Sequence, residues 1–362
     1  MELFPKIIGQ IQAKRILTAL YQHQHFPPLL FAGPKGVGKR TTAINFAQII
    51  NCSTQDDLDK NQCLRCQQIG NLSHSEIKII FPIAPVSQSE DKDEKESQKG
   101  LERIFREIEE NLPLYCLEQM RPNIPANYTI SIQIMRWIKQ EMAYKPMVAK
   151  YRVVIIVDAD KMTNEAANAF LKTLEEPQKQ TLFILTTERL SYIIPTIRSR
   201  CQIIRFSPIS KELIAQYLVK TKNIPLSEAE ICAEISEGSL RKALEFYANP
   251  NQFLPQGNLI RLVDSSLVSK EELLLEVINK NFEDFDTEFF LNTLLFLYRK
   301  ALQLKLNISQ IYSNEVVQKI ASQLSTEEII SRLSFILESL QDAELHLNKR
   351  LYLYSVVNSV RF

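Results

Sequence analysis

The sequence has 362 residues, which is enough for two or three domains of ordinary size. Hydrophobic residues make up 45% and charged residues 23%, as in folded globular domains, so a globally disordered chain is excluded. The 43 basic and 42 acidic residues leave a formal net charge of +1. Bulk charge therefore indicates neither a nucleic-acid coat nor a membrane-surface patch.

The N-terminal residues show no targeting signal. Residues 1–10 lack the basic region and apolar run of a signal peptide, and no apolar stretch approaches the roughly 18 residues of a membrane span. We therefore expect a cytoplasmic protein with no membrane partner. Six cysteines in a chain of this length and compartment do not indicate a disulfide framework, which leaves metal binding or packing as their roles.

Residues 1–207 alternate short apolar runs with helical patterns, which predicts an α/β domain with a parallel sheet. The predicted strands are 29–32, 151–157, 182–185 and 202–206. Residues 153–157 are consecutive apolar residues, mostly β-branched, and suit a strand buried on both faces. An insertion of about 84–127 contains residues 89–99, which have no apolar side chain and predict a solvated loop.

From about residue 208 the pattern becomes helical. Segments 211–220, 227–236 and 239–247 predict a small three-helix domain over 208–250. A capping box of Ser227 and Glu230 is expected to open the second helix, and Gly238 to separate it from the third.

The last part of the chain, 251–362, is predicted to be an all-helical domain. After a linker at 249–257, segments 271–278, 287–304 and 326–347 carry apolar residues at three- and four-residue spacing, the last behind a capping box of Ser325 and Glu328. Glycine, only 8 of 362 residues, does not occur after Gly257, and proline does not occur after Pro255. The absence of both helix breakers favours helices throughout.

Three of the eight glycines lie within six residues, directly after the first predicted strand. Gly33-Pro-Lys-Gly36-Val-Gly38-Lys39 has the Walker A pattern, with a helical segment behind it. Glycines let backbone N–H groups face phosphate oxygens, the helix N-terminus adds its positive end, and Lys39 can reach the terminal phosphates. The pattern predicts a site for ATP or ADP.

The residues after the lysine depart from that pattern. A serine or threonine that ligates magnesium is expected there, but the sequence has Arg40 followed by Thr41. One helical step turns a side chain by about 100°, so Thr41 cannot simply replace that hydroxyl. Both residues are assigned to the nucleotide site, and magnesium binding is left open.

The second half of the site is expected at the end of strand 151–157. Asp158 is placed there to hold magnesium through water, the Walker B role, and a cap or turn residue is the alternative. Active ATPases of this type carry a glutamate next, whereas this chain has Ala159. Asp160 would need a different backbone path to serve instead.

These residues, with those that follow, resemble the bacterial clamp-loader subunits of the AAA+ family. Residues 158–177 end in Leu-Lys-Thr-Leu-Glu-Glu-Pro, as does that family's segment after Walker B. Thr187 resembles its sensor 1, residues 199–201 its serine-arginine-cysteine motif, and Arg241 its sensor 2. The resemblance covers residues 1 to about 250, and the C-terminal block is similar to the family's oligomerising collar in type only.

The resemblance implies a hetero-oligomeric machine that loads the sliding clamp onto primed DNA. Ala159 and Arg40 make the chain most similar to the delta-prime type of DNA polymerase III clamp-loader subunit, which does not turn over ATP. Arg200 would then be an arginine finger acting in trans on the nucleotide of a neighbouring gamma/tau subunit. The implied partners are gamma/tau and delta subunits, with the sliding clamp and primer-template DNA reached through the complex. A surface arginine paired with a carboxylate is the plainer alternative for Arg200.

Two other functions stay open. An active AAA+ ATPase of the gamma/tau or helicase-loader type would share the glycine loop, but Ala159 argues against it. A binding module unconnected with replication would keep a nucleotide as a structural ligand.

The family also implies a zinc module after the Walker A helix, and residues 52–74 resemble a degenerate version of it. Cys52 follows the predicted helix, and Cys63 and Cys66 have Cys-x-x-Cys spacing. The family's further cysteine is Lys60 here, so a fourth ligand would have to come from another residue. The candidates are Asp57, Asp59 and His74. Zinc binding is left open, and the other three cysteines are assigned to packing.

Overall fold

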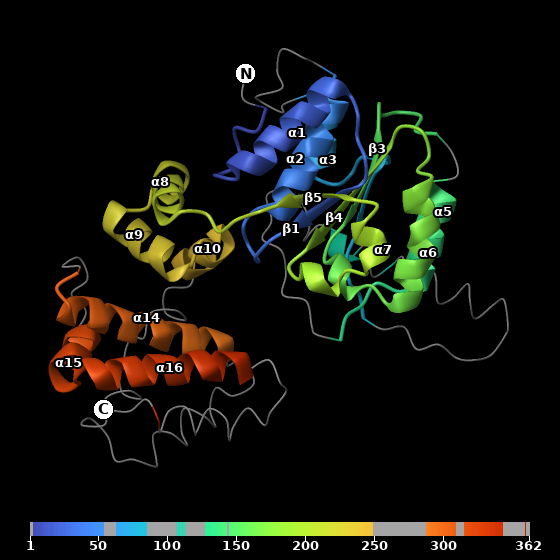
Figure 1. The fold of residues 1–362 in the computed structure, drawn as a ribbon. Coiled ribbons are helices and arrows are strands. Elements are labelled where there is room, and N and C mark those ends of the chain that lie inside the picture. The colour runs from blue at the N-terminus through green and yellow to red at the C-terminus, as the bar shows by residue number, and fades with distance from the viewer. Residues whose placement is uncertain are drawn as a thin grey trace. The chain divides into compact units, whose positions relative to one another are not determined.

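The computed structural model describes residues 3–53, 63–84, 106, 108, 110–112, 127–142, 145–248, 287–308, 315–342 and 359. The chain forms two compact units, Met1–Ala243 and Leu244–Phe362. Figure 1 shows a sheet with helices on both sides in the first unit and a group of helices in the second. None of the described helices has the length and hydrophobicity needed to span a lipid bilayer.

A five-stranded parallel sheet is the centre of the first unit. In spatial order its strands are β2 (Ile77–Ile80), β3 (Arg152–Ile156), β4 (Thr181–Thr187), β1 (Leu29–Ala32) and β5 (Gln202–Arg205). Ala32, the last residue of β1, lies opposite Thr187 of β4 and Arg205 of β5. The carboxyl ends of all five strands therefore lie at the same end of the sheet, called the carboxyl edge below. Ligands of open α/β folds bind there.

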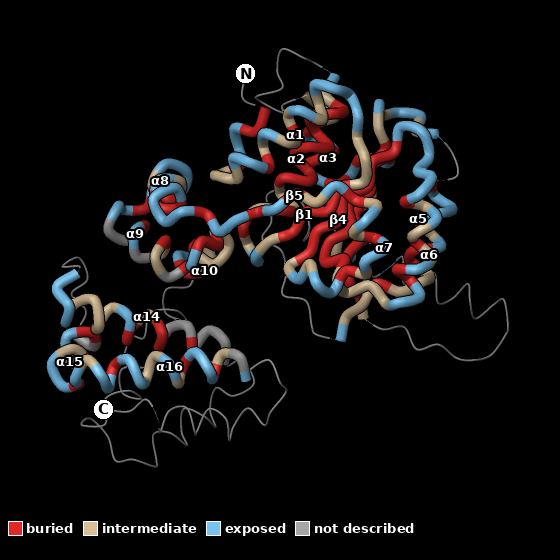
Figure 2. Tube along the Cα trace, in the orientation of Figure 1, coloured by how far each residue is buried: buried red, intermediate tan, exposed pale blue. Residues whose placement is uncertain are grey.

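Helices cover both faces of this sheet. Helices α1 (Ile11–His23), α2 (Lys39–Asn51) and α3 (Leu64–Gly70) lie on one side, and α5 (Ile132–Glu141) and α6 (Asn164–Glu175) lie on the other (Figure 1). Strands β1, β3 and β4 are buried along their whole length, and Figure 2 shows the buried residues gathered in the sheet. This is the environment that runs of aliphatic residues require.

The sequence predicted four of the five strands to within two residues at each end. It missed β2, an edge strand of four residues whose apolar run is interrupted by Lys78. The predicted solvated loop at 89–99 lies outside the described residues.

Three helices follow the sheet: α8 (Lys211–Lys222), α9 (Leu226–Ile235) and α10 (Leu240–Ala248). The predicted capping box of Ser227 and Glu230 is wrong, because α9 begins at Leu226 behind Pro225, which occupies the cap position. Gly238 has a φ of 85° and separates α9 from α10, as predicted. The division after Ala243 falls within α10. The domain boundaries predicted at 208 and 251 stay predictions.

Besides the end of α10, the described part of the second unit contains α14 (Thr287–Lys305), α15 (Glu315–Gln323) and α16 (Thr326–Asp342). Helix α14 packs against both others, and α15 was not predicted from the sequence. The capping box of α16 is confirmed: the Ser325 N–H donates to Glu328 Oε2 at 2.7 Å, and the Glu328 N–H donates to Ser325 Oγ at 3.2 Å. The segment predicted at 271–278 lies outside the described residues.

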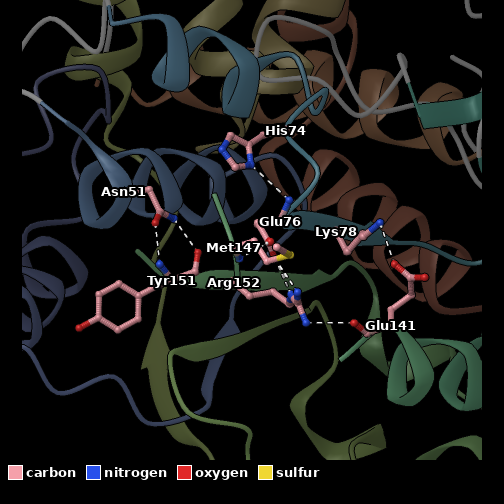
Figure 3. A network of polar contacts seen from close by, with 8 residues as sticks. All are labelled: Asn51, His74, Glu76, Lys78, Glu141, Met147, Tyr151 and Arg152. Carbon is pink, nitrogen blue, oxygen red and sulfur yellow. Dashed lines mark hydrogen bonds and ion pairs between the residues drawn. The ribbon is translucent and has the colours of Figure 1, made fainter. Parts of the chain in front are cut away.

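A buried ion pair joins the beginnings of β2 and β3 (Figure 3). The side chains of Glu76 and Arg152 lie almost wholly inside the protein, and both Nε and Nη2 of Arg152 are 2.7 Å from Glu76 Oε2. Arg152 Nη1 donates to the Glu141 carbonyl at 3.0 Å, and the Met147 N–H donates to Glu76 Oε1 at 2.9 Å. The pair therefore ties two strands to the end of α5 and to the segment that enters β3.

Asn51, the last residue of α2, makes a second connection close to where β3 begins (Figure 3). Its Oδ1 accepts the Tyr151 N–H at 2.8 Å, and its Nδ2 donates to the Tyr151 carbonyl at 3.0 Å. A single buried amide thus satisfies both backbone groups of the residue before β3.

Burial alone would raise the pKa of Glu76, but hydrogen bonds from Arg152 and from the Met147 N–H outweigh it and hold the pKa below its ordinary value of 4.5. The ionised carboxylate therefore favours the folded state. Its contribution is complete above pH 4.5 and declines as the pH falls below that value.

We expect Glu76→Gln to lower the free energy of unfolding of the first unit by about 3 to 5 kcal/mol at pH 7, because Arg152 would stay buried without its counter-charge. The difference from the unmodified protein should shrink at pH 4, because below pH 4.5 the carboxylate is protonated in the unfolded state first and the stabilisation that it provides declines. Urea unfolding followed by circular dichroism at both pH values measures it.

Glu141→Gln is the matched control, because it removes only the partly exposed ion pair of Lys78 with Glu141, whose charged atoms are 3.1 Å apart. It should change stability by less than about 1 kcal/mol. Equal losses in the two variants would contradict the importance of the buried pair.

Candidate nucleotide-binding site

The glycine loop, residues 33–38, connects the end of β1 to the start of α2. Gly36 and Gly38 have φ values of 78° and 96°, which favour glycine. Gly33 needs to be glycine for another reason: a Cβ there would lie 2.2 Å from the Phe206 carbonyl oxygen. Phe206, the residue after β5, thus lies directly against the start of the loop.

Lys39 lies inside this loop. The residue is buried, and its ammonium group donates hydrogen bonds to the carbonyls of Gly33 at 2.6 Å and Pro34 at 2.7 Å. One helical turn on, Thr42 Oγ1 donates to the Gly38 carbonyl at 2.8 Å. A positive charge is therefore held in the concave side of the loop, next to a helix N-terminus, which is a suitable environment for phosphate.

The donor set fits a phosphate better than it fits magnesium. Beside Gly38 there is open space, since a Cβ there would meet no atom within 4 Å. Arg40 and Thr41 are half-buried in the first turn of α2. A guanidinium at position 40 cannot ligate a divalent cation and repels it.

Asp158 lies at the carboxyl end of β3, as predicted, and is 3% exposed. Its φ of 53° turns the chain sharply, and its N–H donates to Thr186 Oγ1 on the adjacent β4 at 3.3 Å. The short helix η3 (Ala159–Lys161) begins immediately afterwards, with the methyl group of Ala159 buried. The position next to Asp158 therefore offers no carboxylate.

Thr187 lies beside the glycine loop and is held by Asp160. The Gly33 N–H donates to the Thr187 carbonyl at 3.2 Å, which places the end of β4 against the start of the loop. Thr187 Oγ1 donates to Asp160 Oδ1 at 2.7 Å and accepts the Arg189 N–H at 3.0 Å. Asp160 thus orients Thr187, a role that the sequence did not indicate.

The start of α10 contacts the same loop. The Arg241 N–H, in the first turn of α10, donates to the Gly36 carbonyl at 3.4 Å. A Cβ at Gly36 would lie 2.0 Å from Ser239 Oγ. Ser239 and Arg241 therefore approach as closely as the absence of a side chain at Gly36 permits.

Gln10 is a second residue that sequence reasoning missed. Its Nε2 donates to the carbonyls of Val37 at 3.3 Å and Ser207 at 2.7 Å, and its Oε1 accepts the Ser207 N–H at 3.1 Å. One side-chain amide thus links the glycine loop to the segment that leads from β5 into α8. A single glutamine before a helix carries no pattern that would have revealed this.

Arg200 lies at the opposite end of the sheet from the glycine loop, where the strands begin (the amino edge). It follows helix α7 (Pro195–Arg198) and precedes β5, whose first residue Gln202 donates its N–H to the carbonyl of Pro28, before β1. The four residues of β1, at roughly 3.3 Å each, separate this level from the glycine loop by about 13 Å. The structure therefore does not bring Arg200 together with the loop of its own chain.

The three cysteines predicted as metal ligands do come together. The sulfur atoms of Cys52, Cys63 and Cys66 all lie within 4.8 Å of one another, and those of Cys52 and Cys63 are 3.9 Å apart. Tetrahedral zinc with bonds of about 2.3 Å to sulfur places thiolates about 3.8 Å apart, so the cluster fits three of four positions.

Cys63 and Cys66 differ in acidity. For Cys63, burial would raise the pKa, but donors at Cys66 and Ser53 outweigh it and lower the pKa from 9.0 to about 6. For Cys66, burial together with the neighbouring sulfurs raises the pKa. All three thiols have to be deprotonated to ligate zinc, so a bound cation would favour the thiolate form of Cys66.

The fourth ligand is not His74 in this structure. His74 is outside the cluster, and its Nδ1 accepts the Glu76 N–H at 3.2 Å (Figure 3). Burial and the charge of Arg65 hold its pKa below 6.5. The other two candidates, Asp57 and Asp59, lie outside the described residues. Cys201 is buried at the start of β5, and burial raises its pKa to about 12, in keeping with the packing role predicted for it.

The parallel sheet, the glycine loop between β1 and α2, and the helices that return to that loop define a domain of the AAA+ class. The model of the family described as DNA polymerase III, delta subunit, matches residues 9–210, more than half of the chain. The chain therefore belongs to this family.

Individual relatives are distant. The chain is 27% identical over 300 residues to subunit tau of Bacillus subtilis (80% of this chain, 45% of that protein) and 30% identical over 267 residues to subunit gamma/tau of Mycoplasma pneumoniae (72% and 33%). It is 23% identical over 346 residues to subunit delta' of Bacillus subtilis (93% and 90%). It thus spans less than half of these tau and gamma/tau relatives.

We expect Gly36→Ala to loosen the contact between α10 and the glycine loop, since the added methyl would overlap Ser239 Oγ. Hydrogen exchange of the Arg241 amide should become about tenfold faster, equivalent to ~1.4 kcal/mol. Gly38→Ala is the control: it imposes similar backbone strain at positive φ but meets no atom. Equal exchange in both variants would show that the contact does not restrain α10.

We expect the purified chain to contain about one zinc ion, held by Cys52, Cys63 and Cys66. Elemental mass spectrometry should find it, and Cys63→Ser should lower the occupancy at least tenfold because one thiolate is lost. Cys232→Ser, which changes a half-buried cysteine outside the cluster, is the control. Chelation should speed proteolysis near α3, and zinc-free protein with unchanged protease resistance would contradict a structural ion.

Proposed function

We propose that this chain is a delta-prime-type subunit that helps to load the sliding clamp onto primed DNA without hydrolysing ATP itself. In this role it supplies Arg200 to the nucleotide of a neighbouring subunit. The observation that carries the proposal is the position of Arg200 at the sheet edge opposite its own glycine loop. An arginine so placed can reach a phosphate only on another chain.

The chemistry at the end of β3 supports the same proposal. Ala159 leaves the position after Asp158 without a carboxylate, and Asp160, the next acid, is engaged by Thr187. This turn thus lacks the glutamate that follows the aspartate in active ATPases of this type and orients the attacking water. Arg40 in the first turn of α2 further weakens binding of magnesium, which hydrolysis requires.

ATP or ADP would be held by the backbone of Gly33, Gly36 and Gly38 and by Lys39. Thr41, Asp158, Thr187 and Arg241 surround the same loop in the proposed site, with Arg40 in the place of the magnesium ligand. A bound nucleotide supplies negative charge that Lys39 can bind in exchange for its bonds to the loop carbonyls. The role proposed for such a ligand is to fix α10 against the loop.

The proposed partners are gamma/tau and delta subunits in a hetero-oligomer, with the sliding clamp and primer-template DNA contacted through the complex. Arg200 would donate hydrogen bonds to the γ-phosphate bound by a gamma/tau neighbour and stabilise the charge that develops during transfer. A cytoplasmic location remains part of the proposal.

An active ATPase of the gamma/tau or helicase-loader type is the second candidate. The intact glycine loop and the 27% and 30% identity to tau and gamma/tau relatives favour it. Hydrolysis of ATP by the isolated chain separates the two: the delta-prime-type role predicts none above background, and steady turnover would support the second candidate.

We expect Arg200→Ala to leave assembly with gamma/tau and delta subunits intact and to lower the DNA-stimulated ATPase of the reconstituted complex. Turnover at the neighbouring site should fall about 10³-fold or more, because the charge of the transition state loses its cation. Size-exclusion chromatography checks assembly, and a phosphate-release assay gives the rate.

Arg198→Ala is the matched control, since Arg198 is a half-buried arginine two residues away in α7. It should leave the rate unchanged. Lys39→Ala should affect clamp loading only mildly, because turnover at this chain's own site is not needed. An unchanged ATPase with Arg200→Ala, or clamp loading abolished by Lys39→Ala, would overturn the proposed role.

A further inference from the structure

Arg200 is held by a carboxylate of its own chain. Glu175 is the last residue of α6, and its Oε1 accepts hydrogen bonds from Nε of Arg200 at 2.9 Å and from Nη2. Nη1 of Arg200 donates to the Thr196 carbonyl at 2.9 Å. Three bonds from two different segments therefore fix the plane of the guanidinium.

These bonds leave part of the guanidinium for another acceptor. Arginine has five N–H donors, and the three bonds within the chain use one on each nitrogen. One N–H on each terminal nitrogen is left over, which is the pair that binds two oxygens of a phosphate. With its side chain 33% exposed, Arg200 is open to such a ligand from outside.

Stability of the fold does not account for this pair. A carboxylate at the last position of a helix is unfavourable, because the C-terminal end of the helix is already negative. The Glu175 side chain is 46% exposed, and ion pairs as exposed as this one add little to folding. Glu175 therefore destabilises the end of the helix and adds little to the stability of the fold. A role in positioning Arg200 explains this residue better than a structural role does.

We propose that Glu175 is a positioning residue that holds Arg200 in the orientation needed to meet a phosphate on the neighbouring subunit. This inference rests on the proposed trans role of Arg200. An unrestrained arginine loses much rotamer freedom when it binds, whereas one already fixed by Glu175 and Thr196 has lost it on folding. Preorganised charge of this kind accelerates a reaction without improving the binding of its ground state.

The opposite role would be a latch, in which Glu175 keeps Arg200 away from the phosphate. A latch has to open before the arginine acts, so its removal would raise the rate. A positioning residue stays bound while the arginine acts, so its removal lowers the rate. The two roles therefore predict changes of opposite sign.

The test is the DNA-stimulated ATPase of the complex reconstituted with gamma/tau and delta subunits. Glu175→Ala should lower kcat at the neighbouring site about tenfold with little change in KM for ATP, because Arg200 loses its fixed orientation while ATP binding is unaffected. Glu175→Gln keeps one acceptor oxygen, so its kcat should lie between that of Glu175→Ala and that of the unmodified protein. Alanine is a better helix former than glutamate, so α6 should persist.

Glu176→Ala is the matched control, because Glu176 is the adjacent acidic residue, exposed at the cap of α6. It should leave kcat unchanged. In the background of Arg200→Ala, Glu175→Ala should have no further effect. A further fall there would show that Glu175 acts independently of Arg200 and would overturn the inference.

The outcomes separate this inference from the proposed function. If Arg200→Ala leaves the rate unchanged, the trans role fails and the positioning role fails with it. If Arg200→Ala lowers the rate but Glu175→Ala does not, the trans role stands and only the positioning role is overturned. A rise in kcat with Glu175→Ala would identify the latch instead.

Discussion

Parallel pairing of five strands, of which β1, β3 and β4 are buried along their whole length between two layers of helices, is the constraint on which the first unit depends. No strand reverses direction, so whatever follows a strand is gathered at one edge and whatever precedes it at the other. The glycine loop, Asp158 and Thr187 come from three different parts of the sequence and meet because β1, β3 and β4 end side by side. The register between Ala32 and Thr187 fixes that meeting point.

The two edges of the sheet carry different parts of the chemistry. The carboxyl edge holds a concave, positively charged loop, which is contacted by Ser239 and by Arg241 of α10 and hydrogen-bonded by Gln10. The amino edge holds Arg200, at the level where β5 begins. In the proposed role, a subunit built this way would accept a phosphate at one edge and present an arginine to a neighbouring subunit at the other.

Much of this could be predicted from the sequence, because the signals were local. The strand at 153–157 is a continuous run of buried apolar residues, and the glycines of the loop lie within six positions. The failures were also physical. The apolar run of β2 is interrupted by Lys78, and helix α9 is capped at Pro225, two positions before the predicted cap Ser227. His74, a candidate ligand, instead accepts the Glu76 N–H.

The sequence by itself determined the fold class, the glycine loop, Asp158, the missing carboxylate at Ala159 and the three clustered cysteines, since each depends on residue type at short spacing. Only the tertiary structure decided the partners: Asp160 for Thr187, Gln10 for the loop, Arg152 for Glu76 and Glu175 for Arg200. These partners are 25 or more residues apart in the chain. They are brought together by strand order and by helix packing, and no local pattern specifies either.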